Sequence, residues 1–165
     1  MAKKPEAANG NVEAEAADEA SKGTSLRVLG QYVKDLSFEN PHAPASLTVA
    51  NPEIAVMVNV GGRQLGGNDY EVELKLEVKA TQTGKAAFMA DLTYGGAFRL
   101  ENIPQDMLQP ILLIECPRLL FPFARQVLAD ATRNGGFPPV MLDPIDFAQL
   151  YQRRLQTGGE PAGNA

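Results

Sequence analysis

The chain has 165 residues, of which 44% are hydrophobic, and a formal net charge of −5, so it is long enough for one domain with a hydrophobic core. The acidic balance and the scattered lysines and arginines argue against a nucleic-acid-binding protein, which requires a clustered basic surface. A single histidine, His42, and a single cysteine, Cys116, exclude an internal disulfide and leave too few ligands for a histidine metal site or a Ser-His-Asp triad.

The two ends of the chain have a composition that predicts little fixed structure. Residues 1–25 are mostly Ala, Glu, Lys, Asn and Gly, which predicts a disordered acidic extension with at most a transient helix. Residues 157–165 are rich in Gly, Pro and Ala and are predicted to be a flexible tail. The N-terminus lacks the apolar segment of a signal peptide, and no apolar run approaches the roughly 20 residues of a membrane span. We therefore expect a cytoplasmic protein without direct membrane insertion.

Two strands are predicted in the first part of the ordered region. In residues 26–39, even-numbered positions are mainly apolar and odd-numbered positions are mainly polar, and Leu29 and Lys34 break the alternation. The apolar set is Val28, Tyr32, Leu36 and Phe38, and the polar set is Arg27, Gln31, Asp35 and Glu39. A second strand starts near Ile54, where apolar residues occur on both parities. Residues 61–68 are glycine-rich but lack the Gly-Lys-Ser/Thr ending of a phosphate-binding loop, so we interpret them as a hairpin connection.

The next two strands have clearer patterns. Residues 70–79 alternate perfectly between apolar and charged side chains, which predicts one face in the core and one in solvent. After a turn over residues 81–85, a fourth strand is predicted, in which Gly95 and Gly96 suggest a β-bulge.

Helical periodicity follows Pro104. Pro110 is expected to kink or break a first helix over residues 107–115. A long helix from about Arg118 has an apolar face and is closed by Gly135-Gly136. That face comprises Leu120, Phe123, Ala124, Val127, Leu128 and Ala131. Before a last helix, Asp143 is predicted as the N-cap and Pro144 as the first helical residue. The apolar face of this helix comprises Phe147, Leu150, Tyr151 and Leu155.

Four strands followed by helices predict an α+β fold, with a four-stranded antiparallel sheet and the helices packed on one of its faces. Such a sheet leaves open edges, and a long open edge favours pairing with a second copy of the chain. An oligomer is therefore expected.

Four segments resemble the SecB family of bacterial protein-export chaperones. They are YVKDLSFENPHAP (32–44), YEVELKLEV (70–78), the Gly-Gly end of the fourth strand, and CPRLLFPFAR (116–125), which is followed by NGGFPPVMLDPIDFAQLY. Their order and spacing agree with the family over residues 26–151, within a predicted chaperone domain of residues 26–156. The resemblance implies a homotetramer built as a dimer of dimers.

The resemblance also implies a function. Proteins of this family bind unfolded precursors of secreted proteins without ATP and deliver them to the SecA ATPase. No catalytic residue, cofactor or metal is expected. Positions that line the client groove in the family correspond here to Ile54, Val56, Val58, Tyr151 and Leu155, and Phe137 is a further candidate from the same region.

The family's SecA contact is an acidic sheet surface, and its pattern corresponds to Asp35, Glu39, Met89 and Asp91. Carboxylates around one apolar side chain fit a basic partner. The chain departs from the family in its longer acidic N-terminal extension and in a short C-terminal tail with one charge, Glu160. The departure puts in doubt a second contact, which the family's tail makes with the zinc-binding end of SecA.

Two other functions are alternatives to export. A hotdog-like thioesterase would need a catalytic carboxylate or histidine on the long helix, which offers only Asp130 on its polar side. A SecB-like holdase that serves stress or toxin control, instead of export, is the nearer alternative and would share the same surface chemistry.

Overall fold

The computed structural model describes residues 23–48 and 50–158, so most of the predicted extension and most of the predicted tail lie outside the described residues. In chain order, the strands are β1 (Ser25–Glu39), β2 (Glu53–Gly66), β3 (Asp69–Gln82) and β4 (Lys85–Glu101). A short 3₁₀ turn, η1 (Ala45–Thr48), precedes β2. The helical part comprises α2 (Gln105–Pro110), the π segment η2 (Ile111–Glu115), α3 (Cys116–Asn134) and α4 (Phe147–Gln156).

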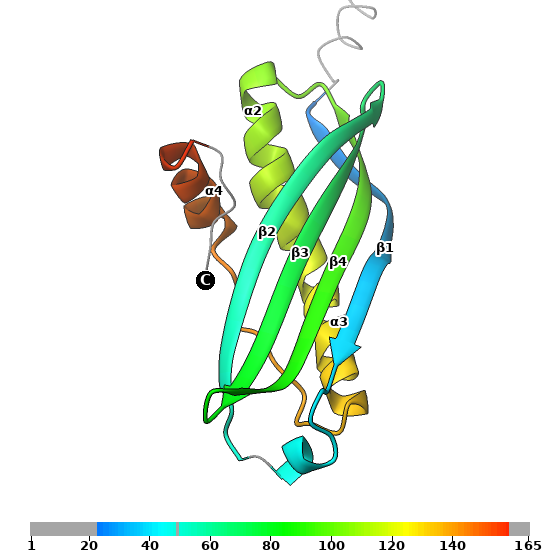
Figure 1. Cartoon of the computed structure of the whole chain (residues 1–165). Coiled ribbons are helices and arrows are strands. Elements are labelled where there is room, and N and C mark those ends of the chain that lie inside the picture. The colour runs from blue at the N-terminus through cyan, green and yellow to red at the C-terminus, as the bar shows by residue number, and fades with distance from the viewer. Residues whose placement is uncertain (1–22, 49, 159–165) are drawn as a thin grey trace, which may run out of the picture.

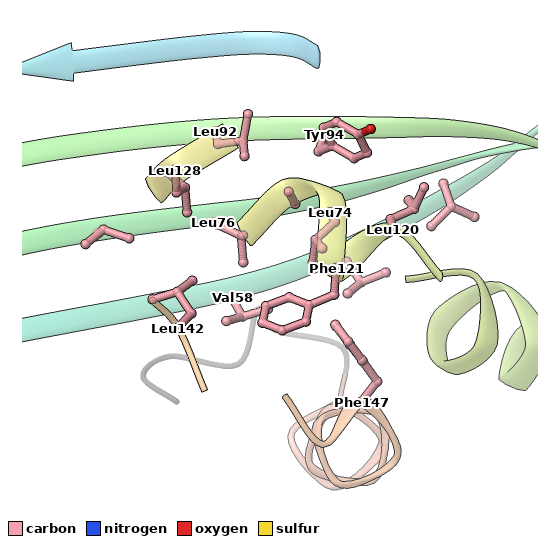
Figure 2. Close-up of a cluster of buried hydrophobic side chains, with 14 of the residues drawn as sticks. Val58, Leu74, Leu76, Leu92, Tyr94, Leu120, Phe121, Leu128, Leu142 and Phe147 are labelled. Carbon is pink, nitrogen blue, oxygen red and sulfur yellow. The ribbon is translucent and has the colours of Figure 1, made fainter. Parts of the chain in front are cut away.

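The four strands form one antiparallel sheet in the order β1-β4-β3-β2, with the long helix across one face and α4 near the β2 edge (Figure 1). The core lies between this inner face and α3, where even-numbered residues of β3 and β4 meet one side of the helix. Figure 2 shows Leu74, Leu76 and Leu92 of the sheet in one cluster with Leu120 and Leu128 of α3. The predicted α+β fold with helices on one face is confirmed.

β1 contains two bulges that the alternation analysis did not resolve. Leu29 and Lys34, the residues that break the pattern, are left out of the pairing with β4. Each bulge shifts the alternation by one residue. As a result Tyr32 lies on the outer face opposite Gly95, and Gln31 lies on the inner face opposite Gly96. The prediction that Tyr32 shares a face with Val28, Leu36 and Phe38 is wrong.

The bulge expected at Gly95-Gly96 is also wrong, since both residues pair regularly with β3 and β1. The glycines are needed because side chains cover them closely on opposite faces. A Cβ at Gly95 would lie 2.5 Å from the ring of Tyr32, and a Cβ at Gly96 would lie 2.7 Å from Leu120 Cδ2.

The first hairpin is tighter than predicted. Gly61 and Gly62 belong to β2, which continues to Gly66, and Gly67-Asn68 alone make the turn. Gly67 has a φ of 54°, a left-handed conformation that glycine adopts without steric cost. The glycine-rich stretch therefore extends an edge strand and is not a loop.

The long helix continues through Pro110. The five-residue π segment η2 follows this proline directly, and the chain remains helical from Gln105 to Asn134. By length and composition alone this helix is apolar enough to cross a membrane, a property that it shares with helices that pack one face on a protein core. Its positions Leu120, Ala124 and Leu128 are buried against the sheet, as predicted, whereas Phe123 is 54% exposed.

The last helix begins later than predicted. Residues 141–146 form neither helix nor strand, and Asp146 is the N-cap, with its Oδ1 accepting from the amide of Gln149 at 2.9 Å. Asp143 and Pro144 lie before the helix, so their predicted roles are wrong. In this segment the side chain of Leu142 is buried beside Val58, and Phe147 packs edge-on against Phe121 (Figure 2).

Candidate functional site: an apolar groove and an acidic sheet face

An apolar groove runs along β2 on the inner face of the sheet. Its widest hollow, of about 680 Å³, is lined by Ile54 and Val56 from β2, Phe88 from β4, and the segment 137–143. A second hollow of about 410 Å³ shares Val56, Leu142 and Asp143 with the first and continues toward α4. We call these joined hollows the β2 groove.

The far end of the β2 groove narrows to about 20 Å³ between Val58, Val60, Leu113, Leu150 and Tyr151. There the guanidinium of Arg154 donates to the main-chain carbonyl of Val60 at 2.8 Å. This bond fastens α4 to the edge of the sheet and ends the groove.

The wall opposite β2 is held by the core. Phe137 is 7% exposed and its ring lies 4.8 Å from that of Phe88 and 6.3 Å from that of Phe38. The buried hydroxyl of Thr132 accepts from the amide of Val140 at 3.0 Å. The extended segment after α3 is therefore anchored at its start, while Met141 on its outside is 59% exposed.

The free edge of β2 lies beside this groove and exposes main-chain groups. The turn between β3 and β4 has two central residues with positive φ, Thr83 (48°) and Gly84 (77°), as in a type I′ hairpin, whose flanking pair is hydrogen-bonded. The N–H and C=O groups of Gln82 therefore bond to β4. Because these groups alternate in direction along a strand, those of odd-numbered residues of β3 bond to β2. Residues 53–64 pair regularly with β3, so the odd-numbered residues of β2 bond to β3 and the even-numbered ones direct their N–H and C=O groups away from the sheet.

Five of the six predicted groove residues meet in this region. Ile54, Val56 and Phe137 line the wide hollow, Val58 lines the second, and Tyr151 lines the narrow end. Leu155 is 65% exposed on α4 and is not among the residues that line these hollows. Pro138, Pro139 and Val140 also line the groove, and only their proximity to Phe137 in the sequence could have pointed to them.

The four predicted SecA-contact residues lie together on the outer face of the sheet. Glu39 of β1 is directly opposite Met89 of β4. Asp91 of β4 is opposite Ser37, which lies between Asp35 and Glu39 on β1. Asp35, Glu39 and Asp91 are exposed, and Met89 is half-buried. Figure 1 shows that β1 and β4 are neighbours and that the helices cover the other face.

The acidic surface extends further than the sequence pattern indicated. Glu77 of β3 lies directly opposite Asp91, an unfavourable pairing of like charges, and Met57 of β2 lies on the other side of Glu77. Lys75 binds Glu77 at 3.0 Å, and this bond, with the nearby charges of Asp91 and Asp35, raises the pKa of Lys75. The strand alternation placed Glu77 on this face, but only the register shows which residue it opposes.

A buried carboxylate, Glu71, was missed on the same face. It was predicted to be solvated but is 4% exposed, because Tyr32 and Arg63 cover it from β1 and β2. The hydroxyl of Tyr32 donates to it at 2.5 Å, and this bond, with those from Lys34 and Arg63, lowers the pKa of Glu71. Burial and the same bond raise the pKa of Tyr32.

The other chemically reactive groups have structural partners. Burial against the sheet raises the pKa of the Cys116 thiol to about 12, which fits its predicted packing role. Asp130, the residue that a thioesterase would need, binds Arg133 at 2.8 Å on the exposed side of α3. Among residues 23–48 and 50–158 there is no group of three His, Cys, Asp or Glu side chains that could hold a metal ion.

Comparisons with known proteins agree with the geometry. The family model of the preprotein translocase subunit SecB matches residues 19–158. A relative from Afipia carboxidovorans, named protein-export protein SecB, is 54% identical over 147 residues, covering 88% of this chain and 91% of its own length. A relative of the same name from Azorhizobium caulinodans is 56% identical over 145 residues, covering 82% and 91%.

A solved structure has the same fold at low sequence identity. It is a SecB-like chaperone from Mycobacterium tuberculosis in complex with a ChAD peptide from the HigA1 antitoxin, with a TM-score of 0.58 and 13% identity. The match covers 78% of this chain and 95% of that chain. The resemblance found in the sequence is thereby confirmed, and the chain belongs to the SecB family.

Proposed function

We propose that this protein is an ATP-independent chaperone that binds unfolded secretory precursors and delivers them to SecA. The observation that carries the proposal is the β2 groove, which has an apolar floor of Ile54, Val56 and Val58 beside a free strand edge. An unfolded chain exposes both apolar side chains and unpaired main-chain groups. Relatives more than 50% identical are named protein-export protein SecB, which supports export as the process served.

In this proposal the client binds as an added strand. Even-numbered residues of β2 direct their side chains to the floor of the groove and their main-chain groups to the free edge beside it. An extended client segment that lies antiparallel or parallel to β2 would pair with these groups and place alternate side chains on the apolar floor. Recognition of the main chain does not depend on sequence, so one groove would accept many precursors.

A pair of matched variants tests the client site. Ile54 and Met57 are both on β2 and are 43% and 42% exposed, but Ile54 faces the groove and Met57 faces the opposite side of the sheet. We expect Ile54→Asp to weaken retention of a precursor diluted from denaturant, and Met57→Asp to leave it unchanged. Light scattering after size-exclusion chromatography measures retention. Equal retention by both variants would contradict the groove assignment.

The acidic outer face is the proposed contact for SecA. Asp35, Glu39 and Asp91 are exposed carboxylates around the half-buried Met89, which suits a basic segment of a partner. We expect Asp35→Lys combined with Asp91→Lys to abolish most SecA binding in calorimetry without changing the mass of the oligomer. Unchanged affinity would remove this assignment.

The proposed assembly is a homotetramer, a dimer of dimers. Two exposed apolar surfaces support it. On β1, an edge strand, Val28, Leu29, Val33 and Leu36 are 42–45% exposed, and on the helices Met107, Leu119 and Phe123 are 43–54% exposed. Burying a strand edge and a helix face in two kinds of contact would remove both from water.

The cytoplasm is the proposed location, and no catalytic step is part of the proposed mechanism. The alternative is a general holdase that serves stress or toxin control. It is favoured by the fold shared with a SecB-like chaperone that was solved with an antitoxin peptide. Binding of an antitoxin peptide with higher affinity than a secretory precursor would favour the alternative.

A further inference from the structure

The bulge at Lys34 decides which way Asp35 points. Val33 pairs with Tyr94 and Asp35 pairs with Thr93, so Lys34 has no partner on β4. With uninterrupted alternation from Tyr32, the side chain of Asp35 would lie on the inner face. The extra residue re-aims it outward, beside Asp91.

The side chain of Lys34 is held by the central part of the sheet. Its ammonium reaches across β4 to Glu71 at 3.1 Å and also binds Glu73, both on β3. Tyr32 lies flat over Gly95 and donates to Glu71, and Arg63 of β2 binds the second oxygen of Glu71 at 2.5 Å. One buried carboxylate thus joins the two edge strands across β3 and β4.

The geometry points to Glu71 as a positioning residue for partner docking: it anchors Lys34, and so fixes the bulge that aims Asp35 at a basic partner. The inference rests on the SecA contact proposed above. β1 is an edge strand with exposed side chains, whereas β3 lies between two strands and is largely buried. Anchoring to β3 therefore lowers the cost of ordering Asp35 when the partner binds.

Lys34→Met separates positioning from simple electrostatics. The substitution removes a positive charge near an acidic surface, so charge alone predicts tighter binding of a basic partner. Loss of positioning predicts weaker binding of that partner instead. We expect SecA to bind Lys34→Met about tenfold more weakly, comparable to losing one well-placed charge contact. Tyr32→Phe, which changes no charge, should weaken binding in the same direction by a smaller factor.

Lys79→Met is the matched control. Lys79 is exposed on β3 of the same face, opposite Met89, and takes no part in the Glu71 contacts described here. Its loss should leave SecA affinity unchanged or raise it. Precursor retention should be the same in all three variants, because the β2 groove lies on the other face of the sheet. Equal or tighter SecA binding by Lys34→Met would overturn the inference.

Hydrogen exchange keeps the inference testable without SecA. In Lys34→Met and Tyr32→Phe, amides of residues 33–37 should exchange at least several-fold faster than in the wild type, and those of β3 should not change. Unchanged exchange in β1 would refute the anchoring role. If wild-type protein does not bind SecA, the docking proposal fails, and the exchange result then decides the role of Glu71 independently.

Discussion

Glu71 lies on a sheet face that the alternation of β3 marks as solvated, yet its carboxylate is enclosed by Tyr32, Lys34 and Arg63. A buried carboxylate is favourable only when its charge is matched and its oxygens are hydrogen-bonded, and here both oxygens have donors. Removing one partner therefore reduces the compensation of a buried charge. The residue is consequently sensitive to both substitution and pH.

This cluster predicts a pH dependence of stability. The hydrogen bond from Tyr32, with those from Lys34 and Arg63, lowers the pKa of Glu71 relative to the unfolded chain, where it is about 4.3. Such a group contributes stability above the unfolded pKa, and the contribution is lost as pH falls through the folded pKa. Urea unfolding should show Glu71→Gln less stable than wild type at pH 7, with the difference shrinking below about pH 4. A constant difference would contradict this.

At Gly96 the core packs so closely that it leaves no room for a Cβ atom. An alanine there would place its methyl 2.7 Å from both Leu120 of α3 and Phe98 of β4, inside the core. We expect Gly96→Ala to lower the free energy of unfolding by about 1–3 kcal/mol, the usual cost of overpacking. Gly61→Ala is the control, since no atom lies within 4 Å of its added Cβ. Similar denaturation midpoints for the two variants would show that α3 can shift.

At the level of elements, α4 offers a direct comparison of two aspartates. Asp146 caps the helix through the amide of Gln149, whereas Asp143, which the sequence pattern favoured, lies three residues before it. Replacing an N-cap aspartate by alanine costs about 1 kcal/mol. Thermal unfolding should therefore show Asp146→Ala destabilised and Asp143→Ala nearly unchanged. Equal effects would mean that α4 starts elsewhere in solution.

The sequence predicted the type and order of the strands and helices because their hydrophobic periodicity is strong. It could not predict the bulges at Leu29 and Lys34, since a bulge becomes visible only through the register with a partner strand. The roles of Gly95 and Gly96 depend on Tyr32 and Leu120, which are distant in the chain. Among the candidate groove residues, Leu155 is exposed and outside the lining of the hollows, because its place depends on how α4 packs against β2 and not on helical spacing alone.

At the level of the whole molecule, the exposed side of the long helix is one of the two apolar surfaces that support the proposed tetramer. Phe123 is 54% exposed and lies one turn from Leu119, which is 43% exposed. We expect Phe123→Glu to reduce the mass measured by light scattering to that of a dimer, because a buried unpaired carboxylate opposes association. Gln152→Glu, which adds the same charge at an exposed position of α4, is the control. A tetrameric Phe123→Glu variant would argue against this face.

The reactivity of Cys116 reports on how often the long helix separates from the sheet. It is the chain's one cysteine, it is fully buried under the sheet, and its pKa of about 12 keeps it protonated. A thiol in this state reacts with disulfide reagents only after the long helix has moved away from the sheet. The rate of labelling therefore measures how often the core opens, and a bound precursor that leaves this rate unchanged would be held by a closed chaperone.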